Sequence, residues 1–142
     1  MRALVIMIAA LVCAGFAQNA RAGDMPLPTP PQIDCKSPAN QMELDYCAGV
    51  DFKAADARLN ALYQGLMAKY NTNNQALLRD SEEKWIAWRD SECAYENALT
   101  VGGTIHPMME TQCDTEKTNA RIKDLERQRD CEEGDISCNP PL

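Results

Sequence analysis

The residues most able to do chemistry in this sequence are carboxylates, grouped on one short segment. Glu82, Glu83, Asp90 and Glu92 lie close together in the chain. Two acids held across a sugar would form the catalytic pair of a glycoside hydrolase. Acids spread around a helix are more often an ordinary solvated surface, and this spacing does not bring two of them together. We therefore assign no catalytic residue among them.

Histidine and cysteine chemistry is also poorly supported. His106 is the only histidine, it lies directly before Pro107, and no G-x-S-x-G turn offers it a serine nucleophile. The cysteines form no C-x-x-C pair, and one imidazole is too few for an ordinary zinc site, so neither a zinc site nor a thioredoxin-like centre is expected. We predict a protein that is not an enzyme and that binds no metal and no cofactor.

Two tryptophans form a second candidate site. Trp85 and Trp88 are three residues apart and would share one face of a helix. Such a pair can stack on a carbohydrate, but large aromatic side chains at helical spacing usually fill a core. We expect both side chains in the core, with Arg89 paired to a carboxylate or bound to capping carbonyls.

The third candidate is the turn Gly102-Gly103-Thr104, which lies between Cys93 and Cys113. One glycine is enough for a left-handed helix C-cap, and Thr104 can help to cap the next helix. The second glycine then has no evident structural role. A small turn held by a disulfide can enter a narrow cleft with little ordering cost. Both interpretations stay open: plain helix-turn chemistry, or a partner-binding site made of these three residues.

The N-terminal segment predicts export. Residues 1–22 have an early arginine, an apolar run and a closing Ala20-Arg21-Ala22, which is typical of a cleaved signal peptide. Lipidation at Cys13 is the alternative, although Val12 fits such a site poorly. No other stretch is apolar enough to span a bilayer, so we expect no stable membrane insertion after cleavage and a location in the periplasm or outside the cell.

The charge of the mature chain is strongly negative. Cleavage removes two arginines and no acid, so 14 basic residues become 12 against 21 acids, and the net charge changes from −7 to −9. An acidic surface disfavours nucleic acid and anionic lipid and favours cationic partners. The same charge is also sufficient simply to keep an exported protein soluble.

The rest of the sequence has helical periodicity and no alternating strand pattern. Residues 23–34 form a proline-rich leader, and residues 35–130 form the domain, followed by a cysteine-containing tail at residues 131–142. We predict an all-α fold, a small antiparallel bundle of three main helices plus a short N-terminal one, stapled by disulfides. The expected helices cover residues 37–49, 50–70, 75–99 and 107–130. The third of them is expected to place Leu78, Trp85, Trp88, Tyr95 and Leu99 on one side.

Cleavage leaves an even number of cysteines, which implies disulfides in an exported chain. They are Cys35, Cys47, Cys93, Cys113, Cys131 and Cys138. Cys93 and Cys113 lie at equal distances from the turn on antiparallel helices, so they are level and predicted to pair. Sequential pairing is the simplest of the fifteen solutions. It adds a bridge across the first short helix and one that closes the tail.

Several of these segments together have a recognisable arrangement. "ADARLNALYQGLM", "EKWIAWRDSEC", "GGT", "PMMETQC" and "TNARIKDL" follow one another in a pattern that resembles the family of the lysozyme inhibitor LprI. The resemblance covers residues 35–129, and the tail lies beyond it. It implies an exported bacterial helical domain that binds and inhibits lysozyme.

The functional prediction combines this resemblance with the export signal and the charge. We predict an exported binding protein that inhibits lysozyme-type muramidases by stoichiometric blocking of the cleft, with a basic lysozyme as the partner and no nucleic acid bound. The alternative is an envelope interaction module, either an adaptor or a neutraliser of another toxin.

Overall fold

The computed structural model describes residues 33–132 and 134–136. The predicted signal peptide, residues 23–32 of the predicted leader and Cys138 lie outside the described residues. In the described part, no helix combines the length and the apolar character needed to cross a membrane.

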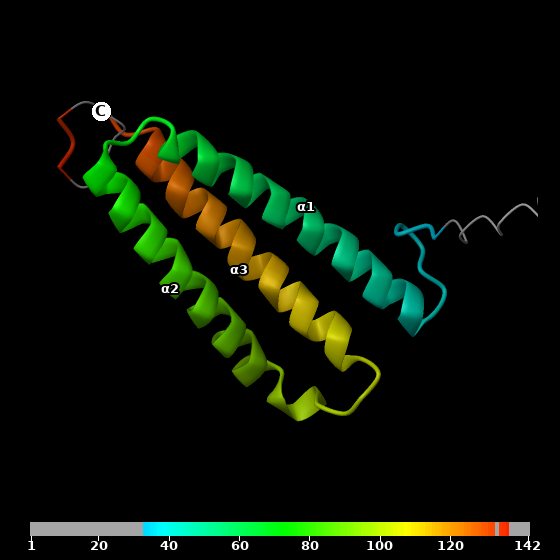
Figure 1. The fold of residues 1–142 in the computed structure, drawn as a ribbon. Coiled ribbons are helices and arrows are strands. Elements are labelled where there is room, and N and C mark those ends of the chain that lie inside the picture. The colour runs from blue at the N-terminus through cyan, green and yellow to red at the C-terminus, as the bar shows by residue number, and fades with distance from the viewer. Residues whose placement is uncertain (1–32, 133, 137–142) are drawn as a thin grey trace, which may run out of the picture. The chain divides into compact units, whose positions relative to one another are not determined.

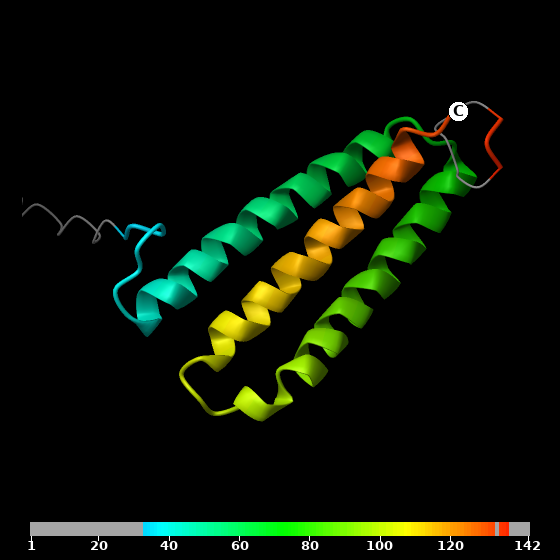
Figure 2. The same ribbon diagram turned by 180° about the vertical axis from the view of Figure 1, so that it is seen from behind.

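Three long helices make up the described domain, as Figure 1 shows, and its residues contain no strand. They are α1 (Gln41–Met67), α2 (Thr72–Glu96) and α3 (His106–Arg129), and a single 3-10 turn, η1 (Ala98–Thr100), follows α2. Successive helices are antiparallel, so α1 and α3 run in the same direction. Helix α3 contacts both other helices and lies between them in Figures 1 and 2. The predicted all-α class is confirmed.

The prediction of a separate short first helix is wrong at its boundary. Helix α1 runs without a break through Gly49, where a helix end had been expected. A glycine inside a helix costs roughly 1 kcal/mol, but its neighbours Cys47 and Ala48 are buried and hold the segment in the bundle. The helix begins later than the Ser-Pro pair suggested, because the Asn40 side chain accepts the Glu43 N–H at 3.0 Å and caps it.

The main hydrophobic core lies at the end of the bundle where α1 turns into α2. Tyr70 is buried there, and the Gln75 side chain donates to the carbonyls of Met67 and Tyr70, both at 2.9 Å. These bonds satisfy acceptors at the end of α1 that the helix itself leaves open. The buried cluster comprises Leu59, Leu66, Tyr70, Ile122 and Leu125, with Leu62, Leu78 and Trp85 packed against it.

The opposite end of the bundle has a thinner core and contains both described disulfides. Its buried apolar side chains are mostly small or contain sulfur: Cys47, Ala48, Cys93, Met108 and Cys113. The bridges Cys35–Cys47 and Cys93–Cys113 have Cα separations of 5.4 Å and 5.6 Å. Both predicted pairs are therefore confirmed. Cys138 is not described, so the tail bridge from Cys131 stays a prediction. Cross-links supply the stability that apolar volume does not supply here.

Candidate partner-binding site

The connection between α2 and α3 is a continuous run of tight turns. The N–H groups of Thr100, Gly103 and His106 donate to the carbonyls of Asn97, Thr100 and Gly103, at 2.9, 2.9 and 3.2 Å. Each bond joins residues three apart, so the connection consists of consecutive hydrogen-bonded turns. The loop therefore has a defined conformation before any partner arrives.

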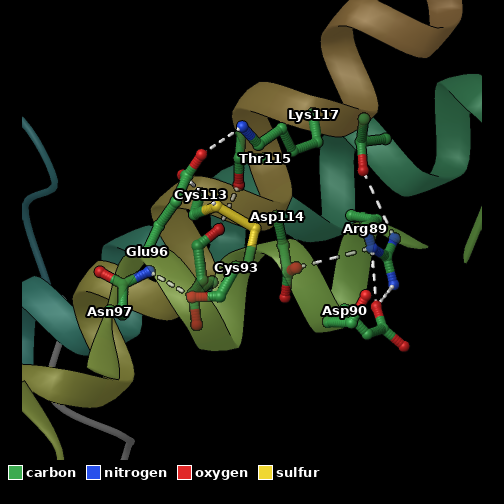
Figure 3. Close-up of a disulfide and its surroundings, with 12 residues drawn as sticks. Arg89, Asp90, Cys93, Glu96, Asn97, Cys113, Asp114, Thr115 and Lys117 are labelled. Atoms are coloured by element: carbon green, nitrogen blue, oxygen red, sulfur yellow. Dashed lines mark hydrogen bonds and ion pairs between the residues drawn. A yellow bond between two sulfur atoms is a disulfide. The ribbon is translucent and has the colours of Figure 1, made fainter. Parts of the chain in front are cut away.

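Asn97 fastens this loop to the disulfide behind it. The residue is buried, and its side-chain amide and backbone N–H donate to the Cys93 carbonyl at 2.9 and 3.1 Å. Figure 3 shows Asn97 beside the bridge from Cys93 to Cys113. The Thr100 hydroxyl adds a bond to the Asn97 carbonyl at 2.7 Å and lies 2.8 Å from Nδ1 of His106. The only histidine of the chain thus helps to hold the loop.

Both glycines of the turn have structural roles. Gly102 has a φ of +83°, which is the left-handed conformation that the C-cap interpretation predicted. A Cβ on Gly103 would lie 3.1 Å from the Thr100 carbonyl oxygen, closer than most Cβ contacts, so the backbone of the turn would have to shift by a few tenths of an ångström to hold a side chain there. The second glycine therefore has a tight backbone contact that was not evident from the sequence. It follows that neither glycine needs a partner to explain it.

The turn still leaves hydrogen-bond donors available. Within the part of the chain that the structure describes, the hydroxyl of Thr104 and the N–H groups of Gly102 and Thr104 have no intramolecular acceptor. All three residues are exposed. A carboxylate or carbonyl of another molecule can accept these bonds.

Apolar side chains surround the turn and point to solvent. The exposed fractions are 79% for Tyr95, 102% for Leu99, 70% for Val101 and 43% for Ile105. We call these four residues the apolar collar. The collar was not predicted from the sequence, because the spacing of apolar residues indicated an inward side for Tyr95 and Leu99. At 100° per residue, Tyr95 lies about 80° around the helix from Trp85, and α2 ends before Leu99.

The two tryptophans have different environments, so the prediction that both are core is only half right. Trp85 packs against the hydrophobic core. Trp88 is 46% exposed, and the ammonium of Lys117 lies 5.9 Å from its ring centre. The face of α2 that carries Trp88 also carries Tyr95, two turns further on, and it points away from the core.

Arg89 forms the centre of a charged cluster beside the disulfide, as Figure 3 shows. Its guanidinium lies 5.3 Å from the Phe52 ring and 5.4 Å from the Trp85 ring. It donates to Asp90 at 2.7 and 2.9 Å and lies 3.5 Å from Asp114. The predicted pairing of Arg89 with a carboxylate is confirmed. Stacking on two rings while forming an ion pair suits the flat guanidinium group.

Asp114, the second carboxylate of this cluster, is half-buried. One of its carboxylate oxygens, Oδ1, is buried and has no hydrogen-bond partner in the described structure. Burial raises the pKa of Asp114, opposed by the charge of Arg89 and reinforced by Asp90 and Glu110. On the other side of the bridge, Glu96 accepts from Lys117 at 2.7 Å, and its second oxygen lies 3.2 Å from the Cys113 sulfur.

The candidate catalytic carboxylates do not form a site. Glu82 is buried in an ion pair with Arg121 of α3, whose Nε donates to it at 2.8 Å. Glu83 is exposed, Glu92 is half-buried, and Asp90 is bound by Arg89. Among the described residues, no three metal-ligating side chains come together. Glu82 is bound by Arg121 and Asp90 by Arg89, so both carboxylates are held in ion pairs within the described domain.

Charge is unevenly distributed along the bundle. We call residues 34–53 and 85–117 the loop half, since they flank the α2–α3 connection. This half contains ten acids and four lysines or arginines, a net charge of −6. The other half, residues 54–84 and 118–132, has eight of each and is neutral. The negative charge of the described helices is therefore concentrated at the end that carries the collar.

Comparisons with known proteins place the chain in a family. A family model described as lysozyme inhibitor LprI matches residues 34–125, from the segment before α1 through most of α3. The chain is 29% identical over 138 residues to an uncharacterized protein of Rhizobium meliloti (strain 1021), and the match covers 88% of this chain and 94% of that protein. No solved structure shows a significant match. Because the family model matches well over half of the chain, the protein belongs to the LprI family of lysozyme inhibitors.

Proposed function

We propose that the mature protein is an exported inhibitor of lysozyme-type muramidases that binds its target one to one and blocks its cleft. Membership of the LprI family is the observation that carries this proposal. The N-terminal signal pattern and the described disulfides support a location outside the cytoplasm. The protein acts by binding and performs no catalysis of its own.

The Gly102-Gly103-Thr104 turn is the segment we propose to enter the cleft. Its free donors are the groups that a cleft with two carboxylates can accept. The hydrogen-bonded turns and the bridge behind them keep the ordering cost of binding low. The net charge of −6 around the loop attracts a basic enzyme and orients this end towards it.

The test is inhibition of cell-wall lysis by c-type lysozyme, a basic enzyme, with purified mature protein. We expect lysis to stop at about one inhibitor per enzyme, because one loop fills one cleft. Full lysis at a large molar excess of the protein would contradict the proposal and favour an envelope adaptor or a neutraliser of another toxin.

A pair of matched variants tests the position of the loop. Thr104→Arg puts a bulky side chain at the tip of the turn, whereas Thr72→Arg makes the same change at an exposed position at the opposite end of the bundle. Both change the net charge by one unit. We expect only Thr104→Arg to abolish inhibition. Equal effects of the two variants would mean that the loop does not contact the enzyme.

A further inference from the structure

We propose that the apolar collar around the turn, rather than the turn itself, supplies most of the affinity, and that its partner is a basic protein with an apolar hollow ringed by lysine or arginine. This inference rests on the proposed function, and it names the contact surface and the chemistry of the partner. The collar is the set defined above: Tyr95, Leu99, Val101 and Ile105.

The exposed apolar side chains are concentrated where the negative charge is. Of the eleven large hydrophobic side chains that the described structure leaves exposed, nine lie in the loop half, and the others are Leu77 and Ile136. Exposed apolar area and net charge are independent properties of a surface. Their coincidence at one end points to an interface with an apolar centre and a charged rim, which is the usual anatomy of a protein–protein contact.

The backbone beneath the collar is held in place before binding. Leu99 lies in η1, whose neighbours are fixed by the bonds from Thr100 to Asn97, and Val101 precedes the left-handed Gly102. Leu99 is fully exposed although the backbone on both sides is hydrogen bonded. An exposed leucine gains no burial free energy within the fold, and that free energy becomes available when another molecule covers the side chain.

The rim of the collar is acidic and only partly neutralised within the chain. Lys117 pairs with Glu96, and Arg89 pairs with Asp90 and Asp114. Three further carboxylates on the same helices form no ion pair with a lysine or arginine among the described residues. They are Glu92, Glu110 and Glu116. Glu110 lies 3.5 Å from Nε2 of His106, and Glu92 and Glu116 interact with Lys117 through charge alone. The rim keeps a net negative charge, which favours positive groups on whatever covers the collar.

The same charge argues against the other occupants of an apolar surface. Nucleic acid and anionic lipid headgroups would be repelled by ten acids against four basic residues. A second copy of this chain, docked loop to loop, would bring two net charges of −6 together. A basic protein is the partner that satisfies both the apolar centre and the acidic rim, and a basic muramidase has this chemistry under the proposed function.

The experiment compares the same substitution at the two ends of α2. Leu99→Ser removes the most exposed collar side chain, and Leu77→Ser removes a leucine that is 59% exposed at the far end of the helix. Binding to c-type lysozyme is measured by calorimetry at one fixed ionic strength. We expect the dissociation constant of Leu99→Ser to rise at least tenfold, through faster dissociation, and that of Leu77→Ser to stay within twofold.

A second pair keeps the test decisive. Leu99→Lys and Leu77→Lys both add a positive charge, and the collar variant should bind a basic enzyme even more weakly than Leu99→Ser. Thermal melting controls for folding, and we expect no change because the Leu99 side chain makes no buried contact. If wild-type protein binds and the Leu99 variants bind equally well, the collar inference is wrong while the proposed function stands. If wild-type protein does not bind lysozyme, both are wrong.

Discussion

Removal of the Cys93–Cys113 bridge should weaken both folding and binding, whereas removal of Cys35–Cys47 should weaken folding alone. The two bridges have sequence separations of 20 and 12. On the chain-entropy relation these loops correspond to about 3.3 and about 2.8 kcal/mol of stability. The paired alanine variants are therefore closely matched in expected stability loss, and they differ in what each bridge holds.

The difference lies in the loop. The Cys93 carbonyl anchors Asn97, from which the run of turns to His106 begins. The Cys35 bridge instead ties the entry segment to α1. Leu99, Val101 and Ile105 are the three collar residues that follow α2. Ordering their side chains on binding costs about 0.5–1.5 kcal/mol each, so loss of the first bridge should weaken binding by at least tenfold. Loss of the second should change it by less than twofold.

The assay has two parts. Urea unfolding followed by circular dichroism gives the free energy of unfolding of each variant, and calorimetry with c-type lysozyme gives its dissociation constant under conditions where both remain folded. A decrease of less than about 1 kcal/mol in the free energy of unfolding of the Cys93→Ala/Cys113→Ala variant would contradict the stability expected from this bridge. Equal binding of lysozyme by the two variants would refute the expected effect of this bridge on binding.

Three further predictions concern stability. Arg121→Met leaves the buried Glu82 carboxylate without its partner and should reduce the free energy of unfolding, measured by urea titration, by about 3 kcal/mol. The control variant Lys84→Met breaks an exposed ion pair and should change the free energy of unfolding by less than about 0.5 kcal/mol. Burial raises the pKa of Asp114, so the folded state favours the protonated form of this carboxyl. Asp114 therefore stabilises the fold fully at pH values below its ordinary pKa, and this contribution is lost as pH rises through the pKa of the folded state. The Asp114→Asn variant lacks this titration, so its melting temperature should fall less than that of the wild-type protein as pH rises above about 4. The same pH dependence in both proteins would contradict the raised pKa of Asp114. Gly102→Ala must adopt a φ of +83° and should destabilise the protein by about 1–2 kcal/mol, whereas a neutral effect in thermal melting would show that the turn relaxes.

The sequence predicted the features that follow from helical periodicity and from the level positions of cysteines. Leu59 and Leu66, two turns apart, and Ile122 and Leu125, about one turn apart, all lie in the core, in keeping with helical periodicity. The bridge from Cys93 to Cys113 followed from equal distances to a turn. These are local rules, and the fold did not override them.

Other features depend on tertiary contacts and were not predictable from spacing. Gly49 predicts a helix end, but α1 continues past it, because the two residues before it are buried in the bundle. The role of Gly103 appears only when the Thr100 carbonyl is placed beside it. The outward direction of Trp88 and Tyr95 depends on which face of α2 meets the other helices. The apolar collar was not predicted for the same reason, because apolar side chains at helical spacing near the end of α2 are normally expected to face the core.

We propose that this protein binds a basic muramidase through its loop end. The most direct measurement is a calorimetric titration of c-type lysozyme with mature protein, run in parallel with Leu99→Ser and Leu77→Ser. We expect saturable one-to-one binding that Leu99→Ser weakens at least tenfold and Leu77→Ser leaves unchanged. Absence of binding by the wild-type protein, or equal binding by all three proteins, would contradict it.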